Sequence, residues 1–247
     1  MLTKFLKLFI LIMILFYENG FASLSASEIL NKVENLPYPQ TSKTENTQII
    51  DRNGKKITLK FITYSMGKDE KMLLEYTYPP RTKGLKILIL DKGKNIYFYS
   101  PRTGRIRKIP THQRNRSVNG SDFSYEDITE GSYREKFNYE KIGEDEKFYK
   151  IKLIPKKPDE YSYAYLIIYV EKPTFLLKKI EIYDKKTKEL FKIMEIKSYK
   201  KIKNYNIPTE IIMKNLFKNS ITTIKTTNIE INTRIDKSLF EPQKLGR

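Results

Sequence analysis

Hydrophobic residues recur every three to four positions only near the N-terminus, and from about Thr44 onward they alternate with polar residues. The first pattern predicts a short helix, and Ser25 with Glu28 three positions later forms a capping-box signature at its start. The apolar positions of this helix are Ile29, Leu30, Val33 and Leu36. Pro37 and Pro39 should end it, because proline lacks an amide hydrogen and disfavours helix in the preceding residue.

The alternating pattern predicts a series of antiparallel strands separated by turn residues. Asn53-Gly54 suits a tight hairpin turn that requires positive φ, with strictly alternating residues after it. The predicted strands after this turn are 57–61, 71–78, 85–90, 96–100, 105–109, 135–142, 147–154, 161–171, 175–183, 190–199, 205–213 and 221–232. We therefore expect a mainly β (α+β) fold, one large curved sheet of about ten to eleven meandering strands. Only residues 110–134 are long and polar enough to hold a loop or short helices.

The segment 161–170 is apolar on both faces, although the chain offers little predicted helix to cover a sheet. A curved sheet wrapped over a few helices would enclose an apolar interior, and any unfilled space would be a cavity for an apolar ligand. A core filled by the protein's own side chains fits the same composition. The alternation selects these candidate cavity residues: Leu59, Phe61, Leu74, Tyr76, Phe98, Leu153, Tyr165 and Ile167.

The first 22 residues have the layout of a secretory signal peptide. Lys4 and Lys7 supply positive charge, and the apolar run from Phe5 to Phe16, interrupted only by Lys7, is shorter than the about 20 residues a membrane-spanning helix needs. Cleavage is expected after Ala22, with a second candidate site after Ala26, and an uncleaved N-terminal anchor is the alternative. Residues 23–247 would then form one exported domain. Because the chain has no cysteine, it forms no disulfide and has no Cys for N-terminal lipidation.

The distribution of charged residues along the chain has one specific feature. The net charge is +18, but most lysines lie among carboxylates as on a solvated surface, which argues against nucleic-acid binding by an exported protein. Arginine is distributed less evenly, since half of the ten arginines fall within residues 102–116. These are Arg102, Arg105, Arg107, Arg114 and Arg116. Guanidinium groups pair with phosphate or carboxylate, so the cluster could contact lipid headgroups or an acidic partner. A charged strand edge that resists aggregation is the alternative.

The sequence contains few parts from which an active site could be built. There is one histidine, His112, and no cysteine, Gly-x-Ser-x-Gly motif or phosphate-binding glycine loop. Asp122, Glu126 and Asp127 could act as acids and bases or bind calcium. A turn followed by a capped helix start explains the same residues more simply. We expect no enzyme activity, no metal and no cofactor.

Two stretches resemble the outer membrane lipoprotein-sorting protein family, a group related to the periplasmic lipoprotein carrier. They are Asn95-Ile-Tyr-Phe-Tyr-Ser-Pro-Arg-Thr-Gly-Arg-Ile-Arg-Lys-Ile109 and Gly120-Ser-Asp-Phe-Ser-Tyr-Glu-Asp127, with Gln113-Arg114 between them. Tyr78-Pro79-Pro80 and Leu239-Phe240-Glu241-Pro242 fit the same pattern, and Tyr97 stands where members often have Trp. The resemblance implies an unclosed antiparallel β-barrel with a helical lid, whose concave face holds acyl chains or a lipid.

The leading hypothesis is a periplasmic carrier that binds lipid or lipoprotein acyl chains in a hydrophobic cavity. Its partners would be the acylated cargo and, as the family resemblance implies, an inner-membrane lipid exporter, and a monomer is expected. An envelope sensor or adaptor that binds a protein segment in the same half-barrel is the alternative.

Overall fold

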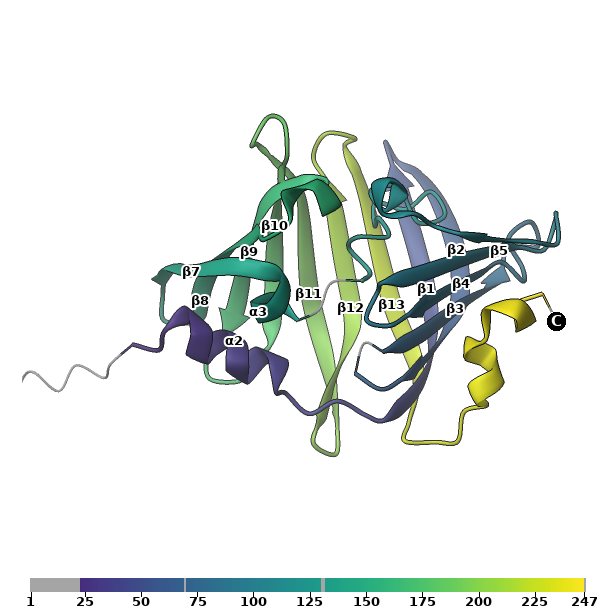
Figure 1. Cartoon of the computed structure of the whole chain (residues 1–247), viewed down its shortest axis with the longest axis horizontal. Helices are drawn as coiled ribbons and strands as arrows, with labels where there is room; N and C mark the ends of the chain where they lie inside the picture. Colours follow the sequence, from purple (N-terminus) through teal and green to yellow (C-terminus); the bar gives the residue numbers. More distant parts are fainter. Residues whose placement is uncertain (1–22, 69, 130–131, 247) are drawn as a thin grey trace, which may run out of the picture.

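The computed structural model describes residues 23–68, 70–129 and 132–246 (Figure 1). The predicted signal segment, residues 1–22, lies outside the described residues. Over the described ranges, no helix has both the length and the apolar character needed to cross a membrane.

Thirteen strands form one antiparallel sheet. They are β1 Thr41–Arg52, β2 Lys55–Met66, β3 Lys71–Tyr78, β4 Lys86–Leu90, β5 Asn95–Ser100, β6 Arg105–Lys108, β7 Phe137–Glu144, β8 Phe148–Pro155, β9 Tyr163–Glu171, β10 Leu177–Asp184, β11 Leu190–Ile202, β12 Tyr205–Asn215 and β13 Ser220–Ile231. The sheet has more strands than the expected ten to eleven, because all twelve predicted runs pair as strands and β1, before the Asn53-Gly54 turn, is the thirteenth.

The strand order explains why the sheet stays open. It runs β6-β5-β4-β3-β2-β1-β13-β12-β11-β10-β9-β8-β7, so β6 and β7, which follow each other in the chain, lie at opposite edges. The connection between them must therefore cross from one edge of the curved sheet to the other (Figure 1). This is the unclosed antiparallel sheet that the family resemblance implied.

Within residues 23–68, 70–129 and 132–246 the helices are few and short. They are α2 Ala26–Glu34, α3 Tyr133–Lys136, and the 3-10 turns η1 Thr111–Gln113, η2 Pro158–Glu160, η3 Lys237–Phe240 and η4 Pro242–Lys244. The predicted capping box of α2 is present: the backbone N–H of Ser25 donates to the Glu28 carboxylate at 2.8 Å, and the backbone N–H of Glu28 donates to the Ser25 hydroxyl at 3.3 Å. The predicted hairpin turn is also present, with φ of 52° at Asn53 and 80° at Gly54.

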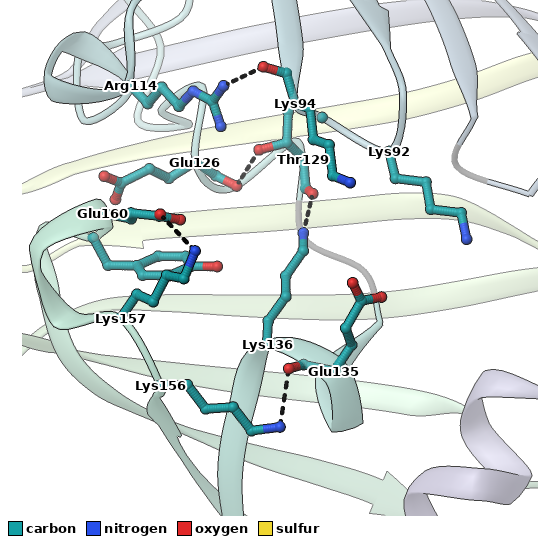
Figure 2. Close-up of a pocket in the computed structure, with 12 residues that line it drawn as sticks. Lys92, Lys94, Arg114, Glu126, Thr129, Glu135, Lys136, Lys156, Lys157 and Glu160 are labelled. Carbon is teal, nitrogen blue, oxygen red and sulfur yellow. Dashed lines mark hydrogen bonds and ion pairs between the residues drawn. The ribbon is translucent and has the colours of Figure 1, made fainter.

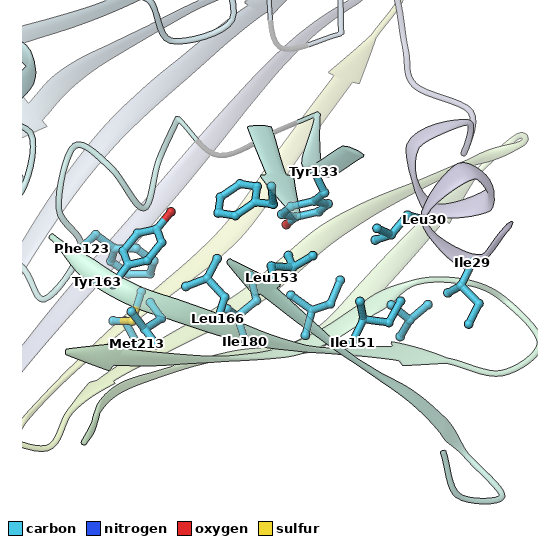
Figure 3. Close-up of a cluster of buried hydrophobic side chains, with 14 residues drawn as sticks. Ile29, Leu30, Phe123, Tyr133, Ile151, Leu153, Tyr163, Leu166, Ile180 and Met213 are labelled. Carbon is cyan, nitrogen blue, oxygen red and sulfur yellow. The ribbon is translucent and has the colours of Figure 1, made fainter. Parts of the chain in front are cut away.

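The inner face of the sheet carries two apolar clusters. The first, here called the helix-covered cluster, lies under α2 and α3 and is drawn in Figure 3. Its buried members are Ile29, Leu30, Phe123, Tyr133, Phe137, Ile151, Leu153, Tyr163, Leu166, Ile168, Val170, Ile180, Ile182 and Met213. The second, here called the loop-covered cluster, lies on β1 to β5 under the connection between β6 and β7. Its buried members are Ile50, Leu59, Phe61, Leu74, Tyr76, Ile87, Ile89, Ile96, Val118 and Tyr125.

The outer face of β3 and β4 is covered by the C-terminal residues. Phe240 and Leu245 pack against Leu73 and Leu88, which alternate along their strands with inner-face residues. Both faces of this part of the sheet are therefore buried, whereas most of β6 is exposed.

Candidate functional site

Five of the eight predicted cavity residues lie together in or against the loop-covered cluster. They are Leu59, Phe61, Leu74, Tyr76 and Phe98. Strand register brings them together: Phe61 is paired with Tyr76, with ring centroids 5.3 Å apart, and Ile87 lies between Leu74 and Phe98 across β3, β4 and β5. The inner face of β2 to β5 is thus a continuous apolar surface.

The other three predicted residues lie elsewhere. Leu153 belongs to the helix-covered cluster. Tyr165 and Ile167 lie on the outer face of β9, which differs from the prediction, because their neighbours Leu166 and Ile168 are the ones that point into the cluster. On that outer face the Tyr165 ring stacks on Tyr183, with centroids 4.3 Å apart.

The connection between β6 and β7 forms the cover of the loop-covered cluster, and we call residues 109–129 the cover segment. Val118 and Tyr125 pack into the loop-covered cluster, whereas Phe123 packs into the helix-covered cluster. Ile128 contacts both clusters. The cover segment therefore lies across the seam between the two apolar surfaces.

Three carboxylates fix the cover segment to the sheet. Asp122, 2% exposed, accepts hydrogen bonds from the hydroxyls of Ser220 and Thr222 on β13, the latter at 2.7 Å. Glu126 accepts from the Ser162 hydroxyl at 2.6 Å. These contacts occupy two of the carboxylates that the sequence offered for catalysis or calcium.

The third carboxylate makes a buried ion pair. Asp127 lies 2.8 Å from the ammonium group of Lys192 on β11, and the two side chains are 5% and 9% exposed. The backbone N–H and hydroxyl of Ser124 also donate to the Asp127 carboxylate, at 2.7 and 2.8 Å. Residues 124–127 form a capped turn, as the simpler interpretation of the sequence held, but the next described helix, α3, begins only at Tyr133.

Burial changes the acidity of this group of side chains. Desolvation raises the pKa of the Glu126 carboxyl, the neighbouring Asp127 charge raises it further, and the Ser162 hydrogen bonds act in the opposite direction. Burial also raises the pKa of Tyr125. In the described part of the chain, no group of three His, Cys, Asp or Glu side chains could hold a metal ion.

The predicted arginine cluster is divided among three places. Arg102 and Arg105 are exposed on the β5–β6 hairpin. Arg107 lies over the Phe98 ring, 5.6 Å from its centroid, and together with Arg116 it lines a pocket of about 330 Å³. Arg114 lines a different pocket, on the other side of the cover segment.

The pocket beside Phe98 combines apolar and basic groups, and we call it the edge pocket. Its lining residues are Phe98, Arg107, Lys108, Ile109, Gln113, Arg116, Ser117, Asn119, Gly120 and Tyr125. Three of these are cations and none is a carboxylate. Phe98 and Ile109 pack against the loop-covered cluster and Tyr125 belongs to it, so the pocket opens at the edge of that apolar surface.

The sequence interpretation missed the partners that hold the cover segment. Ser162, Lys192, Ser220 and Thr222 are far from the three carboxylates in the chain, and single Ser, Thr or Lys residues in strands carry no signal of such a role. Only pairing of the strands places them under the cover segment.

Comparison with solved structures defines the class of fold. A DUF1329 family protein from Desulfovibrio piger is similar with 27% sequence identity and a TM-score of 0.81, covering 88% of this chain and 96% of that chain. A putative outer membrane lipoprotein-sorting protein domain from Vibrio parahaemolyticus has 20% identity and a TM-score of 0.81, covering 90% and 97%. A LolA superfamily protein from Nitrosomonas europaea has 17% identity and a TM-score of 0.70, covering 88% and 98%. The fold is therefore LolA-like, as the sequence resemblance implied.

Comparison with family models identifies the family of the chain. A family model described as "-like: Uncharacterized protein" matches residues 68–247. The chain belongs to this family. A search of the curated proteins finds no match.

Proposed function

We propose that this protein is an exported, periplasmic carrier that binds the acyl chains of a lipid or lipoprotein on the inner face of its half-barrel. Binding would be driven by the hydrophobic effect, which contributes about 0.8 kcal/mol per buried methylene. Release requires an acceptor that offers competing apolar surface. The donor and acceptor would be envelope proteins, with an inner-membrane lipid exporter as the expected donor.

The edge pocket is the observation that carries this proposal. Its floor is apolar, from Phe98 and Tyr125, and its rim is basic, from Arg107, Lys108 and Arg116. An amphiphile has the matching chemistry, with an acyl chain for the floor and an anionic or zwitterionic headgroup for the rim. Arg102 and Arg105, exposed on the adjoining hairpin, would contact a membrane surface or a partner protein.

A second apolar surface, the helix-covered cluster, would have to supplement the edge pocket, which is small for a whole acyl chain. At about 330 Å³ it lies at the small end of the range for ligand pockets. Helix α2 is the cover of that cluster that we expect to move, because it is one nine-residue helix outside the sheet, and its contacts with the body do not include strand pairing. They include buried Ile29 and Leu30 and the ion pair between Glu34 and Arg134 at 2.6 Å. Its displacement would expose Leu153 and its neighbours as a second acyl-binding surface.

Titration of the purified protein with a fluorescent fatty acid tests the proposal, together with native mass spectrometry of the protein from membrane-containing cells. We expect Phe98→Asp to weaken fatty-acid binding at least about tenfold, since it places a charge on the apolar floor. Phe217→Asp is the matched control because Phe217 is 55% exposed, away from the edge pocket, and it should bind like the natural protein. Circular dichroism checks that both variants are folded.

Two results would contradict the carrier proposal. One is a protein that never copurifies with lipid and does not bind the fatty acid. The other is fatty-acid binding that Phe98→Asp leaves unchanged. A consistently lipid-free protein that instead captures a peptide would favour the adaptor hypothesis.

A further inference from the structure

A second pocket lies on the other side of the cover segment, between parts of the chain that are far apart in sequence (Figure 2). It has a volume of about 260 Å³, and we call it the bridging pocket. The β4–β5 turn borders it on one side and the β8–β9 connection on the other. Its lining residues are Lys92, Gly93, Lys94, Arg114, Glu126, Thr129, Glu135, Lys136, Lys156, Lys157, Glu160 and Tyr161.

The described lining of the bridging pocket has an excess of positive charge. It includes six cations and three carboxylates. Two of those carboxylates already have partners: Glu126 accepts from Ser162, and Glu160 lies 3.4 Å from the Lys157 ammonium group. Of these two contacts, only the Lys157–Glu160 pair joins opposite charges, and without it five cations remain against two carboxylates in the described lining.

Three of the cations are bound to carbonyl oxygens instead of carboxylates. Lys136 donates to the Thr129 carbonyl at 3.4 Å, and Lys156 donates to the carbonyls of Arg134 and Glu135 at 3.0 Å. Arg114 donates from Nη2 to the Lys94 carbonyl at 2.7 Å. A carbonyl oxygen carries only a partial charge, so these contacts orient the side chains without neutralising them. Figure 2 shows Arg114 at the top of the view, Lys136 in the middle and Lys156 at the bottom, each held by one of these bonds.

Arg114 has donor capacity that its described neighbours do not use. Its Nε is buried and lacks a hydrogen-bond partner. A guanidinium group presents several donors in a planar fork that matches two oxygens of a phosphate. A buried donor without a partner costs free energy, and an anion within reach would remove that cost.

We infer that the bridging pocket is an anion site for a phosphate group, with Arg114, Lys136 and Lys156 as its principal ligands. A phosphate has several oxygens that can accept from donors on different sides, as the placement of these three residues requires. The phosphate belongs either to a lipid headgroup or to a small soluble phosphate compound. The site can be tested apart from acyl binding, because its three principal ligands belong to neither apolar cluster and, of the described lining, Tyr161 alone packs against one.

The test measures binding of two probes by isothermal titration calorimetry to the full chain and its variants. The probes are inorganic pyrophosphate and a short-chain phosphatidic acid below its micelle concentration. We expect the double variant Lys136→Gln with Lys156→Gln to bind at least about tenfold more weakly, with Lys156→Arg close to natural affinity because it keeps the charge. The matched control is Lys200→Gln with Lys201→Gln, two exposed lysines of β11 outside the pocket.

The two probes separate the sources of the phosphate. Binding of phosphatidic acid alone assigns the site to a lipid headgroup, and binding of pyrophosphate as well assigns it to phosphate groups in general. The inference is overturned if neither probe binds, or if the Lys136/Lys156 variant binds as tightly as the Lys200/Lys201 control. Failure of the carrier proposal would differ, because fatty-acid binding would be lost while pyrophosphate binding remained.

Discussion

The buried ion pair between Asp127 and Lys192 should be a major determinant of how firmly the cover segment is held. With side chains 5% and 9% exposed, neither charge is well solvated if its partner is removed. Loss of one partner of a buried pair costs about 3–5 kcal/mol, whereas replacement of both partners is often nearly neutral. We therefore expect Asp127→Asn and Lys192→Met each to destabilise the protein strongly and the double variant to recover most of that loss.

The two single variants should differ in a defined direction. Lys192→Met leaves Asp127 with two donors from Ser124, at 2.7 and 2.8 Å, so its cost should be near 3 kcal/mol. Asp127→Asn leaves the buried Lys192 ammonium group without its ion-pair partner, so its cost should be nearer about 5 kcal/mol. Urea unfolding at pH 7 measures both, and the double-mutant cycle should give a coupling energy above about 2 kcal/mol. Single effects below about 1 kcal/mol that simply add in the double variant would refute the reasoning.

Two further predictions concern Glu126 in the cover segment and the docking of helix α2. Because burial raises the pKa of the Glu126 carboxyl above its ordinary value, ionisation of this carboxyl costs stability as pH rises through the raised pKa. Glu126→Gln should therefore raise the melting temperature relative to the natural protein at pH 8, and this gain should disappear below about pH 4.5. Thermal melts of both proteins at pH 8 and pH 4 measure the gain. An equal gain at the two pH values would contradict the prediction. Ile29→Ala and Leu30→Ala should each lower the free energy that holds α2 on the sheet by about 2–5 kcal/mol, since both side chains are fully buried. Hydrogen exchange of the backbone amides in α2 and β7 should then become faster. Unchanged exchange rates would count against a movable cover.

The strands and α2 could be predicted from the sequence because their signals are local. Asn53-Gly54 marks its hairpin by the positive φ that both residues adopt, and Ser25 with Glu28 marks the start of α2. The family resemblance then supplied the unclosed barrel, which a list of strands does not determine. The strand order, with β6 and β7 at opposite edges, depends on the pairing of β1 with β13.

The candidate site could be predicted only in part, and the reasons are physical. In β9, Tyr165 and Leu166 are both apolar enough for burial, so alternation could not decide which one faces inward. The outward tyrosine is accommodated by stacking on Tyr183 and by Lys152, whose ammonium group lies 4.7 Å from the Tyr165 ring centroid. The arginine cluster divided because a hairpin and a long connection separate residues that are close in sequence.

The pairing of β1 with β13 also has a consequence for the order in which the chain folds. Neighbouring hairpins from β1 to β6 and from β7 to β13 need only nearby residues, and they can form as soon as those residues are available. The β1–β13 seam joins Ser42 to Ile231, so it must wait for the last strand. Until then β1 and β13 each present an unpaired edge, a template for association with another chain. A truncation before β13 should therefore yield aggregates, not a smaller folded protein.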